Sequence, residues 1–352
     1  MLVYWFLPMV LFLGIITSYE DIKFGKIRNK WILVAIVYSI IASSILFSLN
    51  YYDTNYLIKI LANGLFSIIF GFAIWYANLW TAGDAKLFFA FTILMPIHKP
   101  HSYFFFLTYL SNTFIPLSII LLFYILFKAG KKKKLFYLKK TFSIKIIFRL
   151  IPFIFGFSWI IGLLLGIAGL GSNLVLSFAG IFLLYYIFDA VLKIKILYIG
   201  LLLSLARLIF DKSIYSPQFV SQFLLLTFLF MLVRVFLFSV GSGYLSKEIK
   251  LNDLEKGMIP AEIIIKINGK YAKRMKSFSL IGSIWHNKIG KPLFRNLARG
   301  LSNKDILKLK SLQKKLPFKT LRIQTTMPFA PFLSLGALLT IISQGNFIGL
   351  FF

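Results

Sequence analysis

The sequence predicts an all-α polytopic membrane protein with about ten transmembrane helices and a small basic cytoplasmic domain. Its 352 residues have a mean hydropathy of +0.83, and 59% of them are hydrophobic while only 14% are charged. Soluble globular domains are usually nearer half apolar and a quarter charged. Their surfaces need more polar side chains than this chain supplies, so an arrangement of two soluble domains is excluded.

Long apolar stretches recur along the chain, and each is a candidate crossing because a helix needs about 20 mostly apolar residues to span a bilayer. The ten candidates cover residues 2–19, 31–49, 57–78, 85–98, 103–128, 149–168, 173–192, 195–210, 217–241 and 328–345. The fourth and the eighth are short. No basic segment precedes Leu2, so the first stretch is interpreted as a retained span rather than a cleaved signal peptide. In the sixth, Gly162 and Gly166 form a Gly-x-x-x-Gly step that indicates close helix packing.

Basic residues greatly outnumber acidic ones, with 40 Lys and Arg against 11 Asp and Glu and a net charge of +29. Such a balance often indicates a nucleic-acid partner, but in a membrane protein Lys and Arg gather in the cytoplasmic loops. If the N-terminus lies outside, the loops after the odd-numbered spans face the cytoplasm and hold 35 of the 40 basic residues. The charge therefore predicts this orientation, and no nucleic-acid partner is expected.

Residues 245–326 form a long polar stretch with 19 Lys and Arg, and they are predicted to be a basic cytoplasmic domain. The Asn268-Gly269 pair after a β-branched run predicts a hairpin. Residues 303–315 predict a basic helix, which is either amphipathic at the membrane surface or simply solvated. The basic run Lys131–Lys134 is interpreted as an anchor beside anionic lipid.

The chain has no Cys, which excludes disulfides, thiolate zinc sites and cysteine nucleophiles. Its three His residues are too scattered in the sequence to indicate a metal site. They are His98, His101 and His286. Neither a metal ion nor any other cofactor is therefore expected.

Two of the few acidic residues fall at the same predicted membrane boundary. Asp21 follows the first span, and Asp84 opens the fourth, in the stretch Thr81–Lys86 (TAGDAK). Two complete crossings separate them, so the chain returns Asp84 to the side on which Asp21 lies. Spacing alone leaves two interpretations: a catalytic pair of carboxylates, or a helix cap at Asp84 and the start of a polar loop at Asp21.

A pair of close carboxylates can hydrolyse a peptide bond. Both cannot ionise easily at once, so they share a proton. The ionised one takes a proton from a water molecule that attacks the peptide carbonyl, and the protonated one donates to the developing oxyanion and then to the leaving amine. Because the pair titrates as a unit, acid and base cannot be assigned separately. Gly83 is expected to give the backbone before Asp84 freedom and room for a substrate.

Three stretches of the chain carry motifs of one enzyme family. Trp80–Phe88 (WTAGDAKLF) resembles the Gly-x-Gly-Asp motif of the type IV prepilin peptidases. Asp21–Asn29 (DIKFGKIRN) is similar to the family's first motif, in which an Asp is followed by a basic turn that ends Ile-Pro-Asn. Pro328–Ala337 (PFAPFLSLGA) is similar to the Pro-Phe-Gly-Pro-Phe-Leu-Ala-Leu-Gly block near the family's C-terminus.

The motifs are not matched at every position, although both aspartates are present. Three residues depart from the family's pattern: Thr81 and Ala330, which stand where Gly is usual, and Arg28, which stands where Pro is usual. Residues 17–98 and 316–345 carry the resemblance. The stretch between these segments looks like the long insertion of archaeal members, to which Glu255–Glu262 (EKGMIPAE) is also similar.

The resemblance implies a membrane aspartic endopeptidase, of the archaeal long form, that removes the leader peptide of prepilin-like or archaellin precursors at the cytoplasmic membrane boundary. It makes Asp21 and Asp84 the catalytic residues, with Gly83, Lys86 and Asn29 supporting their motifs. The implied partners are a precursor with a short leader and an apolar helix, and the lipid bilayer. Bacterial bifunctional members often have a cysteine-rich loop and N-methylate the product. This chain has no Cys, so no methyltransferase activity is expected.

The predicted organisation has four parts. Residues 1–128 form an N-terminal membrane domain with the catalytic Asp pair, and residues 129–244 form a basic loop with additional membrane helices. Residues 245–326 are the basic cytoplasmic domain, and residues 327–352 are a C-terminal membrane helix.

Other classes of protein remain open. Asp189, Arg207 and Arg234 lie in predicted spans and would suit a transporter or channel subunit, because charges inside a membrane usually have a function. A local helix pair with Lys193 is the simpler account of Asp189. A presenilin-like intramembrane protease also uses a Gly-Asp motif, and a non-catalytic scaffold would need no such motif. Lys86 either acts on a carboxylate or the substrate, or only anchors a helix end.

Overall fold

The computed structural model describes most of the chain, in segments separated by gaps. The described residues are 2–76, 79–95, 103–128, 143–167, 174–186, 188, 196–241, 246–267, 270–275, 291–293, 300–324 and 327–347. They are mostly helical and divide into two compact units. The first unit comprises Met1–Thr113 together with Ser239–Phe352, and the second comprises Phe114–Phe238.

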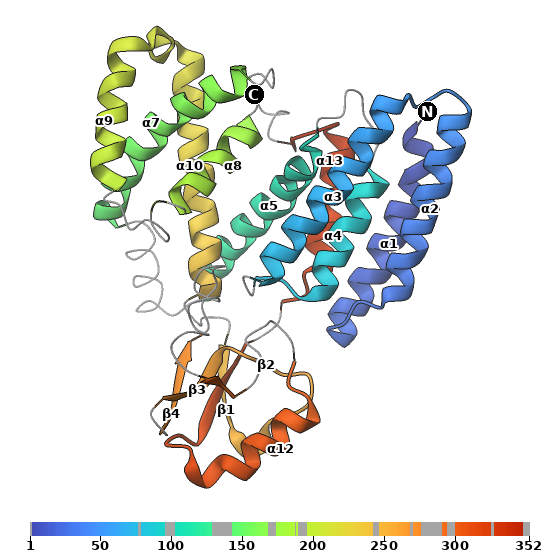
Figure 1. Cartoon of the computed structure of the whole chain (residues 1–352), viewed down its shortest axis with the longest axis vertical. Coiled ribbons are helices and arrows are strands. Elements are labelled where there is room, and N and C mark those ends of the chain that lie inside the picture. The colour runs from blue at the N-terminus through green and yellow to red at the C-terminus, as the bar shows by residue number, and fades with distance from the viewer. Residues whose placement is uncertain are drawn as a thin grey trace. The chain divides into compact units, whose positions relative to one another are not determined.

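The first unit contains a bundle of apolar helices in which the two ends of the chain pack together. Its helices are α1 (Leu2–Phe24), α2 (Asn29–Ser48), α3 (Thr54–Tyr76), α4 (Ala82–Leu94), the first part of α5 (Phe105–Lys128), and α13 (Ala330–Ile342). The C-terminal helix α13 packs against α1 and α4, as Figure 1 shows by its red colour among blue and cyan ribbons. Phe6, Phe88 and Tyr109 are among the large side chains buried in this bundle.

A tight turn joins α1 to α2. Gly25 has φ +59, a left-handed conformation that residues with a Cβ rarely adopt, and its N–H donates to the Asp21 carbonyl over 2.9 Å. Arg28, with φ −79 and ψ 131, is then the N-cap of α2. The glycine therefore ends α1 just after Asp21 and allows the chain to turn back into the bundle.

Helix α4 is shorter than the fourth span expected at residues 85–98. A capping box at Thr81 starts it, and it ends at Leu94, two residues before Pro96 in the sequence. At 1.5 Å per residue its 13 residues are about 20 Å long, less than the hydrocarbon core of about 30 Å. Leu87 and Phe88 are fully buried by the surrounding helices. The apolar composition of this stretch therefore reflects burial within the bundle.

Six helices in the described part of the chain are long and apolar enough to cross a membrane. Their apolar segments are Trp5–Phe24, Asn29–Ser48, Thr54–Tyr76, Phe105–Tyr124, Ile144–Ile167 and Pro217–Arg234. Three further apolar helices are shorter, at Leu174–Tyr185, Leu197–Phe210 and Ala330–Ile342. The expected count of ten spans is therefore not confirmed.

The second unit is a group of helices that begins with the rest of α5. The other elements are α7 (Ile144–Ile167), α8 (Leu174–Tyr186), α9 (Ile196–Phe210), the 3-10 turn η2 (Lys212–Tyr215) and α10 (Pro217–Gly241). Phe153, Ile154 and Phe230 are buried in its apolar core.

Helices α7 and α9 approach each other closely at two glycines. A Cβ on Gly156 would lie 2.6 Å from the Leu203 Cβ, and one on Gly200 would lie 2.9 Å from the α7 backbone. A Cβ on Gly162 or Gly166 would meet nothing within 4 Å. The expectation of close packing at those two glycines is therefore wrong, because the contact is made by a different face of the same helix.

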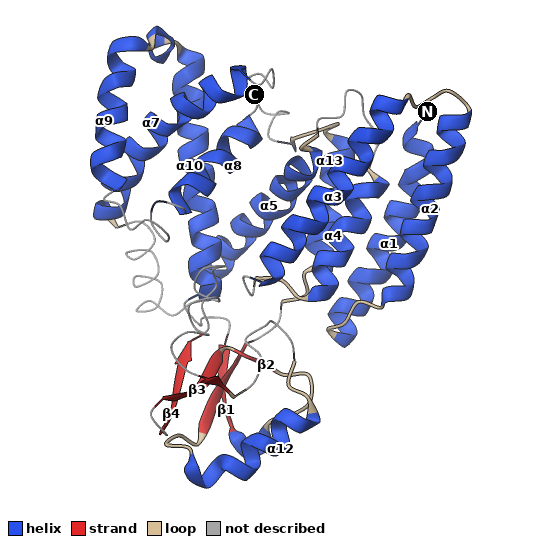
Figure 2. Ribbon diagram, in the orientation of Figure 1, coloured by secondary structure: helices blue, strands red, loops and turns tan. Residues whose placement is uncertain are grey.

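The chain between α10 and α13 contains a small domain with β-strands, which are red in Figure 2. Its two antiparallel sheets have the strand orders β1-β6-β2 and β4-β3-β5. The elements are β1 (Ser246–Lys250), the 3-10 turn η3 (Leu251–Asp253), β2 (Ile259–Pro260), β3 (Glu262–Ile267), β4 (Lys270–Met275), β5 (Lys291–Pro292), α12 (Asn303–Leu312), the 3-10 turn η4 (Gln313–Lys315) and β6 (Thr320–Gln324). Leu251, Ile264 and Leu321 belong to its apolar core. An all-α fold is therefore the wrong prediction for this segment.

Two local predictions for this domain can be compared with the structure. β3 and β4 pair antiparallel with Ile267 opposite Lys270, which confirms the hairpin, while the two turn residues themselves lie outside the described part. Residues 303–315 are helical, as expected. Leu309 is fully buried in the core of the domain. The apolar face of α12 therefore covers the domain and is not available to enter a membrane.

Several sequence predictions fall on residues outside the described part. They concern Lys131–Lys134, Asp189 with Lys193, and His98, His101 and His286. These interpretations stay predictions, as does the four-part organisation with boundaries at residues 128, 244 and 326.

Candidate active site

Asp21 lies in the last turn of α1, beside the start of α13. Its Oδ2 accepts a hydrogen bond from the Ala330 backbone N–H over 3.0 Å, and the Phe329 backbone donates toward the same carboxylate. Phe329 is the N-cap of α13, and Ala330 is the first residue of that helix. The unpaired N–H groups and the positive dipole end of a helix stabilise a carboxylate placed there. The C-terminal motif therefore holds the first aspartate.

Asp84 is the third residue of α4 and is only 4% exposed. Its Oδ2 accepts from the Thr81 backbone N–H over 2.9 Å and from the Thr81 hydroxyl over 2.7 Å. The Asp84 N–H donates in return to Thr81 Oγ1 over 3.3 Å, which completes a capping box. Among the described residues, the donors to this carboxylate reach Oδ2 and none reaches Oδ1.

The two aspartates come near enough for their charges to interact. The charge of Asp21 acts on Asp84, and both α1 and α13 pack against α4. The structure thus brings together the two carboxylates that the count of membrane crossings places at one boundary. The cap interpretation of Asp84 is correct as a description of its local bonds, yet it does not separate this carboxylate from Asp21.

The supporting residues lie around Asp84, but not all of them act as expected. Lys86 Nζ donates to the Asn29 side-chain oxygen over 3.2 Å, an exposed bond that links the starts of α4 and α2. Gly83 lies in the first turn of α4 and does not have a positive φ. A Cβ there would make an ordinary contact of 3.5 Å with the Ile27 Cβ. The expected need for backbone freedom at Gly83 is therefore wrong, because any residue can adopt this helical conformation.

Thr81 is a site residue that comparison with the family motif undervalues. As a departure from Gly it weakens the resemblance, but in the structure it supplies both the N-cap of α4 and a hydroxyl donor to Asp84. A glycine would keep the backbone donor and lose the hydroxyl. The signal is present in the sequence, because Thr-x-x-Asp before an apolar run has the spacing of a capping box.

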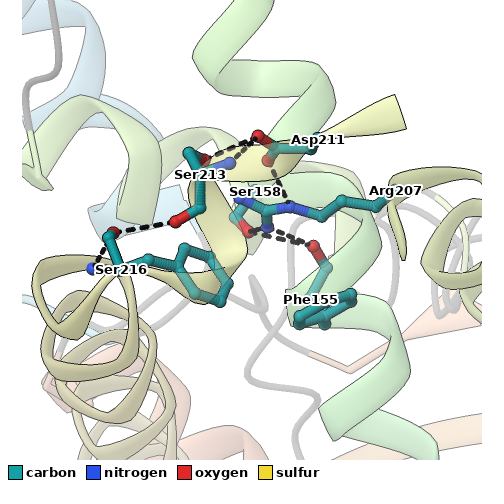
Figure 3. A network of polar contacts seen from close by, with 7 residues as sticks. Phe155, Ser158, Arg207, Asp211, Ser213 and Ser216 are labelled. Carbon is teal, nitrogen blue, oxygen red and sulfur yellow. Dashed lines mark hydrogen bonds and ion pairs between the residues drawn. The ribbon is translucent and has the colours of Figure 1, made fainter. Parts of the chain in front are cut away.

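Charged residues of the second unit form a local network. Arg207 Nε lies 2.9 Å from Asp211 Oδ2, and its Nη1 donates to the Phe155 carbonyl and the Ser158 hydroxyl, each over 2.7 Å (Figure 3). Burial raises the pKa of Asp211, but hydrogen bonds from Ser213 and Arg207 outweigh it and leave this pKa below its ordinary value of 3.8. The buried guanidinium is satisfied by these partners and ties α9 to α7, which does not favour the transporter hypothesis.

The site as a whole consists of two carboxylates, each oriented by hydrogen bonds to one of its oxygens. Among the residues that the structure describes, no three His, Cys, Asp or Glu side chains gather into a group that could hold a metal ion. The arrangement matches the chemistry in which one carboxylate accepts a proton from water and the other donates a proton.

One comparison with known proteins gives a match. Residues 222–319 match the family model described as Archaeal Peptidase A24 C-terminal Domain. Neither the curated proteins nor the solved structures give a significant match. The matched residues lie almost entirely between the two motif-bearing segments, so the match is nearly independent of the aspartate motifs. It also agrees with the interpretation of this stretch as the insertion of archaeal members. The match covers less than a third of the chain, and it supports a relationship to the archaeal prepilin/preflagellin peptidases through this domain.

Proposed function

We propose that the chain is a membrane-embedded aspartic endopeptidase that removes the leader peptide of type IV prepilin-like or archaellin precursors. The observation that carries the proposal is that Asp21 and Asp84 are each held through Oδ2 at the end of a different helix, and that these two helices pack against each other. The A24 peptidase domain supports a peptidase from a separate stretch of the chain. The six long apolar helices support a place in the membrane.

The reaction follows from two carboxylates that share one proton, because two close negative charges repel each other. The ionised carboxylate takes a proton from water as the water oxygen bonds to the peptide carbonyl carbon. The protonated one donates a hydrogen bond to the carbonyl oxygen, and then gives its proton to the leaving amine as the C–N bond breaks. Donors from Ala330 and Thr81 hold one oxygen of each carboxylate, so the pair needs little reorganisation.

We place this site at the cytoplasmic boundary, with the N-terminus outside. Four basic residues at positions 23–30, between α1 and α2, support this orientation, because Lys and Arg gather on the cytoplasmic side of a membrane. The leader of the precursor would stay in the cytoplasm while its apolar helix lies beside the bundle. Exposed apolar side chains on α2 and α3, such as Leu33, Ile40 and Leu61, suit contact with lipid or with such a helix.

The test is cleavage of a co-expressed candidate precursor in membranes that contain the wild-type chain, Asp21→Asn or Asp84→Asn. Asn has nearly the size of Asp and is an equally good helix cap, so both variants are expected to fold. We expect both to lose cleavage at a normal protein level. Full cleavage by either variant would rule out the pair as the catalytic group.

Asp53→Asn is the matched control. Asp53 precedes α3 and accepts a hydrogen bond from the Tyr56 N–H over 2.6 Å, so like Asp84 it is a carboxylate bonded to backbone at the start of a helix. We expect this variant to cleave normally. The mass of the product's N-terminus identifies the cleaved bond, and we expect that it carries no added methyl group.

A further inference from the structure

Glu20 is a buried carboxylate for which the proposed reaction has no use. It directly precedes Asp21 on α1 and is 5% exposed. Neighbouring residues on a helix point about 100° apart. Glu20 therefore meets the start of α2, whereas Asp21 meets the start of α13. Burying a carboxylate costs free energy unless hydrogen bonds and opposite charges compensate.

Among the residues that the structure describes, the partners of Glu20 come from the start of α2. Its Oε2 accepts from the Arg28 backbone N–H over 3.1 Å, and its Oε1 accepts from the Trp31 indole N–H over 2.9 Å. The Arg28 Nε lies 3.4 Å from Oε1, but this side chain is 54% exposed, so the ion pair contributes less than the two hydrogen bonds. The carboxylate therefore closes the turn at residues 25–28 by binding both the N-cap and the first turn of α2.

The closed turn touches the first turn of α4 at two places around Asp84. Ile27 is buried, and its Cβ lies 3.5 Å from where a Cβ on Gly83 would be. Asn29 accepts the hydrogen bond from Lys86. One contact precedes Asp84 in the sequence and the other follows it. The turn and the start of α2 therefore connect α1, which carries Asp21, with the first turn of α4, which carries Asp84.

We propose that Glu20 is a positioning residue, which holds the turn at residues 25–28 against α4 and so fixes Asp84 relative to Asp21. The inference rests on the proposed function for its kinetic consequence, but its geometric content does not require any peptidase activity. Arg28 shows that the bond to Glu20 depends on a backbone N–H at this position. Its φ of −79 would suit a proline, yet a proline has no N–H to donate to Glu20.

The kinetic test compares variants of Glu20 in the full-length chain, purified in detergent, with a precursor as substrate. Glu20→Ala removes both acceptors, and a displacement of Asp84 by about 1 Å would lower kcat about 100-fold. KM for the precursor should change little, because Glu20 is buried and its hydrogen bonds are to groups of this chain. Glu20→Gln keeps one side-chain acceptor and is expected to recover part of kcat. An unchanged kcat in Glu20→Ala would overturn the proposal.

Variants of Arg28 separate its two contacts with Glu20. Arg28→Ala keeps the backbone N–H, whereas Arg28→Pro removes it without straining φ. We expect Arg28→Pro to lower kcat more than Arg28→Ala does. In the Glu20→Ala background the same proline should have little further effect, because the two changes break one interaction. Equal effects of Ala and Pro at position 28 would contradict the proposal.

A cross-linking experiment measures the position of the turn without any cleavage. The chain has no Cys, and the Cβ distance of 3.5 Å between positions 27 and 83 falls in the range of about 3.5–4.5 Å for a disulfide. The double variant Ile27→Cys with Gly83→Cys should therefore oxidise readily in membranes. Adding Glu20→Ala should slow this oxidation. The control is Gly14→Cys with Ser334→Cys, where the Cβ distance is 3.2 Å between α1 and α13, away from both the turn and α4.

The two pairs distinguish positioning from general stability. Slower oxidation at positions 27 and 83, with unchanged oxidation at 14 and 334, supports a local role for Glu20. Unchanged oxidation of the first pair, or equal slowing of both pairs, overturns it. If the wild-type chain cleaves no precursor, the proposed function fails, but the cross-linking result still decides whether Glu20 holds the turn.

Discussion

Gly336 offers a sharp test of the link between α13 and the candidate site. A Cβ added at Gly336 would lie 2.1 Å from Thr113 Oγ1 and 2.9 Å from Thr113 Cα, whereas non-bonded carbons are normally about 3.5–4.0 Å apart. Removing the Thr113 hydroxyl would not relieve the contact with Cα, so α13 or α5 must move. Forcing extra atoms into a packed core typically costs about 1–3 kcal/mol.

The consequence for activity follows from the position of Gly336, on the same helix as Ala330. A shift of α13 by about 1 Å would disturb the 3.0 Å hydrogen bond from Ala330 to Asp21 and lower kcat about 100-fold. We therefore expect Gly336→Ala to lower both the melting temperature and the rate of precursor cleavage. The double variant Gly336→Ala with Thr113→Ala should not restore either.

The assay uses purified protein, with melting temperature and cleavage rate measured on the same samples. Gly162→Ala is the matched control, because a Cβ on Gly162 meets nothing within 4 Å and Ala is favoured over Gly in a helix by about 1 kcal/mol. This control should keep full activity and lose no stability. Normal stability and cleavage in Gly336→Ala would refute the reasoning that α13 must lie this close to α5 to hold Asp21.

Three further predictions concern single side chains. Thr81→Val removes a hydroxyl that donates to Asp84 over 2.7 Å, so we expect kcat to fall about tenfold or more, whereas Thr81→Ser should keep most activity; equal rates in both variants would show that the hydroxyl has no role. Asp211→Asn should lower the melting temperature at neutral pH without abolishing cleavage. Because the pKa of Asp211 lies below its ordinary value of 3.8, the difference in melting temperature between this variant and wild type should persist as pH falls toward that value. It should disappear only at lower pH, and a melting-temperature difference that disappears near neutral pH would contradict this. Leu309→Ala should destabilise the small β-containing domain by about 2–5 kcal/mol, because Leu309 is fully buried, while Leu307→Ala on the exposed face should change it by less than about 0.5 kcal/mol; proteolysis of the domain measures both, and equal resistance would contradict the packing of α12.

The encounter of the two aspartates could be predicted from the sequence, because membrane crossings alternate sides. Asp21 and Asp84 are separated by two apolar helices, so the count alone puts them at one boundary. Which groups orient them could not be derived in this way. The donor from Ala330 depends on how α13 packs against α1, and that contact joins the two ends of the chain.

Hydropathy alone does not distinguish a membrane span from a helix buried inside the protein. A helix buried inside a bundle and a helix exposed to lipid need the same apolar side chains. Helix α4 has 13 residues, many of whose side chains are covered by protein, and the sequence does not distinguish such a helix from a crossing. Glycines show a similar limit, since the sequence reveals the spacing of Gly162 and Gly166 but not which face of α7 meets α9.

Most strands of the small domain could not be predicted, because their residues are polar and their partner strands are far away in the sequence. β1 pairs with β6, with Ser246 opposite Gln324, so the partners stand at opposite ends of the domain's sequence. Both strands carry polar residues that also suit loops. The Asn268-Gly269 signal is local, and for that reason the one hairpin it indicates could be predicted.

The central claim is that Asp21 and Asp84 together cleave the leader from a precursor. The most direct measurement is the mass of the products formed when the purified chain acts on a purified precursor, compared between wild type and Asp84→Asn. We predict that wild type yields a free leader and a mature protein that begins just before its apolar helix, and that Asp84→Asn leaves the precursor intact. Cleavage by Asp84→Asn at the wild-type rate, or no cleavage of any prepilin-like precursor by the wild-type chain, would contradict the claim.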